Sequence, residues 1–136
     1  MRIQSVEIDL VIPYDNNPRD NVAAIEKVAA SINEFGWQQP IVVDENMVVI
    51  VGHTRLLAAK KLEMKLVPIQ IAENLTAEQV KAYRLADNRT NEEASWNMKM
   101  LGSEIKELDD LGVDLMLTGF SDHELSNLLI DPELLE

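Results

Sequence analysis

The fold of this protein is decided by the stretch Val48-Val49-Ile50-Val51-Gly52-His53-Thr54-Arg55-Leu56-Leu57-Ala58-Ala59. Its four leading residues are all apolar and β-branched, which predicts a strand that is buried on both faces. Gly52 breaks this strand, and the run from about residue 54 to residue 62 is rich in Leu, Ala and Lys, which favour a helix. The stretch therefore predicts a strand that passes through a tight turn directly into a helix.

The sequence before this stretch predicts a strand, a helix and a hairpin. Apolar residues alternate over 6–12, which is the period of a half-buried strand, and we expect this strand to end at Pro13. An apolar stripe predicts a helix over 22–35, with Gly36 at its C-terminal cap. Two apolar runs within 41–51 are separated by a polar turn, so we expect them to form the hairpin.

The sequence after this stretch predicts one more strand and then helices. The strand is expected over 66–71, where Pro68 favours an edge or bulged position because it lacks a backbone N–H group. A capping box at 76–79 predicts the start of a helix that runs to about Asn88.

Two further helices are expected in the C-terminal region, one over 98–111 and a short one that begins with a second capping box at 121–124. We therefore predict an α/β (α+β) fold, with a small mixed sheet, helices and a helical C-terminal appendage. The predicted organisation is a core over 1–95, an acidic helical appendage of the same domain over 96–130, and a tail or linker start over 131–136.

Composition excludes several classes of protein. The chain has 136 residues, 46% of them hydrophobic, which is enough for one domain with a hydrophobic core. It has no cysteine, so disulfides, thiolate metal sites and Cys nucleophiles are excluded. No apolar run has the length of a membrane span and the N-terminus has no signal-peptide pattern, so we expect a soluble, cytoplasmic protein without a membrane partner.

Negative charge is concentrated at the C-terminal end. The chain carries 12 Lys and Arg against 24 Asp and Glu, a net charge of −12, and residues 99–136 alone carry 2 basic and 10 acidic groups. Such a surface repels the phosphate backbone. We therefore expect any DNA contact to be indirect, through another domain or chain.

The turn Gly52-His53-Thr54-Arg55 is the strongest candidate site. A helix N-terminus carries unpaired N–H groups and a partial positive charge, which favour an anion. Gly52 would let the backbone approach a phosphate closely, and Arg55 can donate two hydrogen bonds to its oxygens. The alternative is a plain strand–helix turn, with Thr54 as the N-cap and Arg55 solvated.

Other candidate residues also have two interpretations. His53 could act as an acid, a base or a phosphate donor, but a histidine in a turn more often makes local hydrogen bonds. Asp87 and Asn88, expected at the end of the third helix, suit a hard cation such as Mg²⁺ or form a polar helix end. Gln39 could offer its amide to a base or belong to a strand-entry turn. Arg19 is a surface residue unless the fold brings it to the phosphate site.

Taken together, these segments resemble the ParB N-terminal domain. The matching segments, in order, are Asn17-Pro18-Arg19, Phe35-Gly36-Trp37-Gln38-Gln39-Pro40, Val51-Gly52-His53-Thr54-Arg55, Val67-Pro68, Leu75-Thr76 and Ala86-Asp87-Asn88. The resemblance covers roughly residues 6–95. It extends to about residue 130 for the ParB-like domains of phage and bacterial proteins, which often precede a DNA methyltransferase. It implies the ParB/sulfiredoxin fold.

The resemblance also implies a ligand. In partition ParB proteins this domain binds CTP with Mg²⁺, and the glycine turn there reads Gly-Glu-Arg-Arg. We therefore predict a site for a nucleoside triphosphate, CTP or ATP, with Mg²⁺ at Asp87 and Asn88. The predicted nucleotide-binding residues are Arg19, Gln39, Gly52, His53, Thr54 and Arg55.

The resulting functional hypothesis is a nucleotide-binding regulatory module that serves DNA-directed machinery, such as a phage or prophage methyltransferase, with a homodimer as a further expectation. A second hypothesis is a nucleotide hydrolase, phosphotransferase or nuclease with Asp87 and His53 as catalytic residues. A third is an acidic protein-interaction module. Sulfiredoxin chemistry is excluded because its turn needs a cysteine, no methyltransferase motif is present, and no helix-turn-helix domain is recognisable.

Overall fold

The computed structural model describes residues 2–15, 22–93 and 95–129. The chain forms two compact units, Met1–Glu93 (unit 1) and Ala94–Glu136 (unit 2). Within the described ranges, every helix is too short or too polar to traverse a lipid bilayer.

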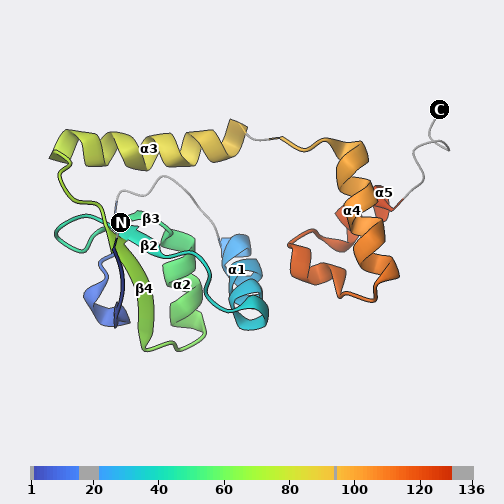
Figure 1. Cartoon of the computed structure of the whole chain (residues 1–136), viewed down its shortest axis with the longest axis horizontal. Coiled ribbons are helices and arrows are strands. Elements are labelled where there is room, and N and C mark those ends of the chain that lie inside the picture. The colour runs from blue at the N-terminus through green and yellow to red at the C-terminus, as the bar shows by residue number, and fades with distance from the viewer. Residues whose placement is uncertain (1, 16–21, 94, 130–136) are drawn as a thin grey trace. The chain divides into compact units, whose positions relative to one another are not determined.

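A four-stranded mixed sheet forms the centre of unit 1 (Figure 1). Its strands are β1 (Ile3–Glu7), β2 (Ile41–Val43), β3 (Val49–Val51) and β4 (Leu66–Ile71), in the order β1-β4-β2-β3. β4 pairs antiparallel with β1 and parallel with β2, and β2 pairs antiparallel with β3. This arrangement confirms the predicted mixed sheet and the predicted hairpin.

Three α-helices accompany the sheet: α1 (Val22–Phe35), α2 (His53–Lys61) and α3 (Ala77–Glu93). α1 packs on α2, α2 contacts β2, and α3 contacts β3 (Figure 1). α2 buries Leu56 and Ala59 against the apolar side chains of the sheet. The core is formed by Ile8, Val11, Ile41, Val43, Val49, Leu56, Ala59, Val67 and Ile69.

Unit 2 has its own small core. It contains α4 (Met98–Asp110), a short 3₁₀ helix η2 (Leu115–Thr118) and α5 (Asp122–Leu128). Leu101 and Ile105 of α4 and Leu125 of α5 are buried together. The predicted capping box is present at the start of α5, where Ser121 and Glu124 each accept a hydrogen bond from the other's backbone.

The first strand differs from its prediction. The ladder lies over Ile3–Glu7, and a 3₁₀ helix, η1 (Ile8–Leu10), follows it, so the prediction of a strand over 6–12 is wrong. The reason is the length of the partner strand: β4 begins at Leu66, which pairs with Glu7, so the ladder with β4 ends there. Ile12 instead forms an isolated bridge with Val48. The turn of η1 then directs both Ile8 and Val11 into the core.

Two other expectations also fail. Pro68 lies in β4, an interior strand, so the prediction of an edge strand is wrong. The proline is tolerated because the pairing of β4 with β2 begins one residue later, at Ile69. The predicted end of the third helix at about Asn88 is also wrong, because α3 continues to Glu93. No glycine or proline interrupts the sequence after Asn88 before that point.

Candidate functional site

Gly52 forms the turn between β3 and α2. Its backbone has φ 101° and ψ 25°, in the left-handed region that side chains disfavour. A Cβ atom added at this position would lie 3.4 Å from both Cα and Cγ1 of Ile41, which belongs to β2. Gly52 therefore serves two needs, a turn with positive φ and close packing against a central strand.

The first turn of α2 follows immediately. Gly52 is the N-cap residue, no side chain caps it, and its carbonyl accepts the first helical hydrogen bond from Leu56 N–H at 2.9 Å. Thr54 is already inside the helix, so the interpretation of Thr54 as the N-cap is wrong. Because the cap is a glycine, the helix N-terminus can approach a ligand without an intervening cap side chain.

Gln39 and Arg55 meet beside this turn. Arg55 Nη2 donates a hydrogen bond to Gln39 Oε1 at 2.6 Å, although the two residues are 16 positions apart. The backbone carbonyl of Gln39 accepts from the Trp37 indole N–H, which fixes the approach to β2. Gln39 therefore orients the guanidinium, and its own amide nitrogen remains a donor.

His53 begins α2 and is half-buried. Burial lowers the pKa of its imidazole below the ordinary value of 6.5, and the positive charge of Lys60 lowers it further. His53 is therefore neutral at pH 7, so it can donate or accept a hydrogen bond at the turn but adds no positive charge there.

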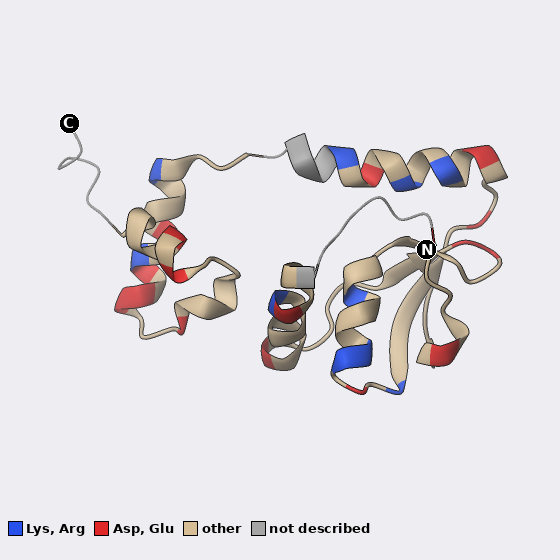
Figure 2. Cartoon of the chain, turned by 180° about the vertical axis from the view of Figure 1, so that it is seen from behind, with Lys and Arg blue, Asp and Glu red and all other residues tan. Residues whose placement is uncertain are grey.

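Positive charge on α2 also joins it to α1. Lys61 forms an ion pair with Glu26, and the hydrogen bond from Lys61 lowers the pKa of the exposed Glu26 carboxyl. Figure 2 shows Lys and Arg along α2, whereas acidic residues dominate unit 2. Arg55 lies in the first turn of α2, whereas Lys60 and Lys61 lie in its last turn.

Asp87 and Asn88 lie on a different element from the glycine turn. Both are half-buried residues of α3, and α3 packs against β3, the strand that leads into Gly52. In the described ranges no group of three or more His, Asp or Glu residues could hold a metal ion. Asp87 and Asn88 could therefore bind Mg²⁺ only if phosphate oxygens and water molecules supplied its remaining ligands. The predicted Arg19 lies outside the described residues.

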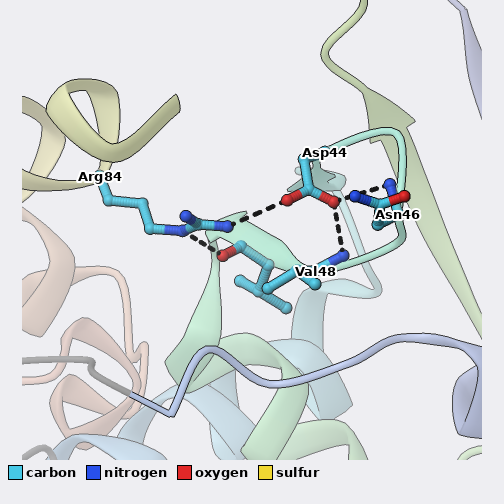
Figure 3. Close-up of polar contacts among 5 residues, drawn as sticks. Asp44, Asn46, Val48 and Arg84 are labelled. Carbon is cyan, nitrogen blue, oxygen red and sulfur yellow. Dashed lines mark hydrogen bonds and ion pairs between the residues drawn. The ribbon is translucent and has the colours of Figure 1, made fainter. Parts of the chain in front are cut away.

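Arg84 of α3 is a central residue that the sequence reasoning missed. Its Nε donates to the Val49 carbonyl at 2.9 Å, and its Nη2 lies 3.3 Å from Asp44 Oδ2 (Figure 3). The guanidinium carbon also lies 4.0 Å from the centroid of the Tyr14 ring. The sequence predicts that Asp44 belongs to the hairpin turn. It holds no local pattern that would predict the contact of Asp44 with Arg84.

Asp44 also organises the hairpin turn. Its Oδ1 accepts hydrogen bonds from the backbone N–H groups of Asn46 at 2.8 Å and Val48 at 3.0 Å (Figure 3). One carboxylate thus holds both the turn and the Arg84 side chain. α3, which carries the predicted metal ligands, is fixed to the sheet by this contact.

Two family models match the chain. The ParB N-terminal domain matches residues 1–89, and the ParB-methyltransferase HTH domain matches residues 99–136. The second match thus identifies a helix-turn-helix family in a region where none was recognisable from the sequence. Within the described part of this match, residues 111–121, including η2, separate α4 from α5.

Two curated relatives each match part of the chain. The ParB-like nuclease domain-containing protein YnaK of Escherichia coli is 38% identical over 68 residues, which are 49% of this chain and 78% of that protein. The probable chromosome-partitioning protein ParB of Rickettsia felis is 36% identical over 88 residues, which are 63% of this chain but only 30% of that protein.

A solved structure shares the fold. The C-terminally truncated chromosome-partitioning protein ParB from Caulobacter crescentus, complexed with CTP-gamma-S, superposes with a TM-score of 0.78 at 21% identity. The superposition covers 99% of this chain and 83% of that chain. It confirms the predicted fold class.

Proposed function

The chain belongs to the ParB N-terminal domain family, and from this membership we propose that it is a nucleotide-binding regulatory module of DNA-directed machinery. The ligand class is a nucleoside triphosphate, CTP or ATP, with Mg²⁺. The Caulobacter relative in complex with CTP-gamma-S supports the choice of ligand. Because the matched segment is 30% of the Rickettsia partition protein, the activity of such a complete protein is transferred here only as a proposal.

The observation that carries the proposal is the hydrogen bond between Arg55 and Gln39 beside the N-terminus of α2. A guanidinium has five N–H donors, so Arg55 can hold Gln39 and still donate to phosphate oxygens. The amide nitrogen of Gln39 and the helix N-terminus add further donors. All of these groups favour the same kind of ligand, an oxyanion.

The other predicted residues have roles within the proposal. Asp87 and Asn88 would hold Mg²⁺ together with the phosphates, and His53 and Thr54 would contact the ligand from the first turn of α2. Arg19 remains a predicted phosphate-binding residue. Mg²⁺, when bound, would neutralise phosphate charge.

Calorimetric titration of the full chain with CTP, ATP and GTP, each with and without Mg²⁺, tests the proposal. We expect CTP or ATP to bind with Mg²⁺, and Arg55→Ala to weaken binding at least tenfold because a charge-assisted contact is lost. Lys65→Ala is the matched control, since it removes one positive charge beyond the opposite end of α2. Absence of binding by every nucleotide, or equal weakening by both variants, would contradict the proposal.

Nucleotide hydrolysis is a second candidate function, favoured by the neutral state of His53. A neutral imidazole can accept a proton from an attacking water, and Asp87 could hold the metal. Release of inorganic phosphate from CTP and ATP measures this activity. If His53→Gln and Asp87→Asn leave phosphate release unchanged, these residues are not catalytic.

We infer an association with DNA from the proteins to which this chain is similar. The named Rickettsia and Caulobacter relatives are chromosome-partitioning proteins, and a ParB structure in complex with the centromeric parS site also shares the fold, with a TM-score of 0.51. For this chain we retain indirect DNA association, a methyltransferase partner and a homodimer as proposals. Size measurement of the full chain with and without nucleotide tests the homodimer.

A further inference from the structure

α4 has an exposed side that the core of unit 2 does not use. Leu101 and Ile105 face the core and are buried with Leu125. Met100 and Leu111, in contrast, are 67% and 70% exposed. Such exposure of large apolar side chains is unnecessary for folding of the unit, so their surface is available to a partner.

Met100, Glu104, Glu107 and Leu111 form one surface, which we call the α4 stripe. Met100, Glu104 and Glu107 lie in α4, and Leu111 is its C-cap residue with right-handed helical backbone angles. Their spacing of four, three and four residues therefore places them on one side of a helix with 3.6 residues per turn. The stripe has an apolar residue at each end and two carboxylates between them. Figure 2 shows the acidic residues along α4.

The charge of the stripe is not compensated within the described part of the chain. Neither the Glu104 nor the Glu107 side chain has an ion-pair or hydrogen-bond partner among the described residues. The basic residues of α4, Lys99 and Lys106, recur on another side of the helix. Lys106 lies 3.9 Å from Asp110, away from the stripe.

The charges and apolar residues of the α4 stripe indicate which kind of partner it can bind. DNA is disfavoured because residues 99–136 carry 2 basic and 10 acidic groups, and phosphates would meet the two glutamates. A second copy of the stripe is also disfavoured, because apolar–acidic–acidic–apolar order places Glu opposite Glu in either direction. A helix with Lys or Arg between two apolar residues would match both the charges and the apolar ends.

We propose that the α4 stripe docks a cationic amphipathic helix of a partner protein. This function is independent of the nucleotide site in unit 1. It also explains how a unit from a helix-turn-helix family can carry so acidic a surface: the unit contacts a protein rather than the DNA backbone.

The test uses the full chain and two labelled synthetic helical peptides. The probe peptide has Leu, Lys, Lys and Leu at the same four-three-four spacing, and the control peptide has Glu in place of both Lys. Fluorescence anisotropy should show binding of the probe peptide only, weakened by added salt. Glu107→Gln and Met100→Ala should each weaken it several-fold, and Glu104→Gln combined with Glu107→Gln at least tenfold.

Asp109→Asn is the matched control, because it removes one negative charge from α4 outside the stripe. Circular dichroism of each variant verifies that α4 remains helical. The proposal is overturned if the probe peptide does not bind, or if Asp109→Asn weakens binding as much as Glu107→Gln, which would indicate general charge attraction. It is also overturned if Glu107→Gln reduces binding of a DNA duplex, or if Met100→Ala abolishes self-association instead of peptide binding.

Discussion

Arg84 of α3 lies 3.3 Å from Asp44 of the hairpin turn, with the two side chains only 11% and 18% exposed. The ion pair connects residues 40 positions apart and fixes α3 to the sheet. Its partial burial makes it more important for stability than a surface ion pair would be.

Arg84→Ala should lower the free energy of unfolding by about 2 kcal/mol, because the Val49 carbonyl and Oδ2 of Asp44 each lose the hydrogen bond from Arg84. Asp44→Asn should lower it by only about 1 kcal/mol, since the amide oxygen can still accept from the hairpin backbone. Urea unfolding followed by Trp37 fluorescence in a Trp96→Phe background measures both. An unchanged stability of Arg84→Ala would show that the ion pair does not hold α3.

Gly52→Ala should destabilise unit 1 more than Gly36→Ala does. Both glycines have positive φ, but a Cβ at Gly52 meets the Ile41 backbone at 3.4 Å, whereas a Cβ at Gly36 has only an ordinary contact at 3.7 Å. We expect a loss of about 1–2 kcal/mol at Gly36 from backbone strain alone, and a larger loss at Gly52. If urea unfolding shows the same loss of stability for both variants, the close contact of residue 52 with β2 does not contribute to the effect.

The half-buried imidazole of His53 should make stability depend on pH. Because burial and Lys60 lower its folded-state pKa below 6.5, the unfolded chain binds the proton more readily than the folded chain. This contribution to stability is fully present above pH 6.5 and is lost as the pH falls through the folded-state pKa. His53→Gln should remove this pH dependence.

An NMR titration measures the pKa of His53 directly. The chain has two histidines, so in a His123→Gln background the remaining imidazole signal belongs to His53. Lys60→Gln should raise the pKa of His53, because it removes a nearby positive charge. A pKa at or above 6.5 in the otherwise unchanged chain would contradict the burial argument.

Ser121→Ala should destabilise unit 2 by about 1 kcal/mol, because the side chain caps the short helix α5. Ser126→Ala, an exposed change inside the same helix, is the control and should have little effect. Thermal unfolding followed by Trp96 fluorescence in a Trp37→Phe background reports on unit 2, since Trp96 packs 5.6 Å from Phe120. Equal effects of the two serine variants would exclude the capping role.

Local signals explain what the sequence predicted well. The helix over 22–35 and both capping boxes depend on residues within a few positions of one another, and the structure confirms all three. The boundaries of β1 depend on where β4 begins, which no local pattern near residue 7 contains. The strand–helix turn at Gly52 was predicted because its glycine and flanking patterns are adjacent.

In the candidate site, too, local features could be predicted from the sequence and long-range contacts could not. Gly52 and Arg55 were identified from the turn and from the resemblance, and their positions at the start of α2 match this prediction. The contact between Gln39 and Arg55 could not be derived, because it needs β2 to lie beside α2. Arg84 was missed for the same reason: its partners are 35 and 40 positions away.

The α4 stripe lies on one helix and its C-cap residue, with no contribution from distant parts of the chain. In evolutionary terms, such a surface can change by substitutions at four codons while the glycine turn and its arginine stay the same. If both proposals hold, the choice of partner and the choice of ligand can therefore diversify independently among related genes. A chimera that receives only these four positions from a relative would then change the proposed partner and leave the proposed nucleotide ligand unchanged.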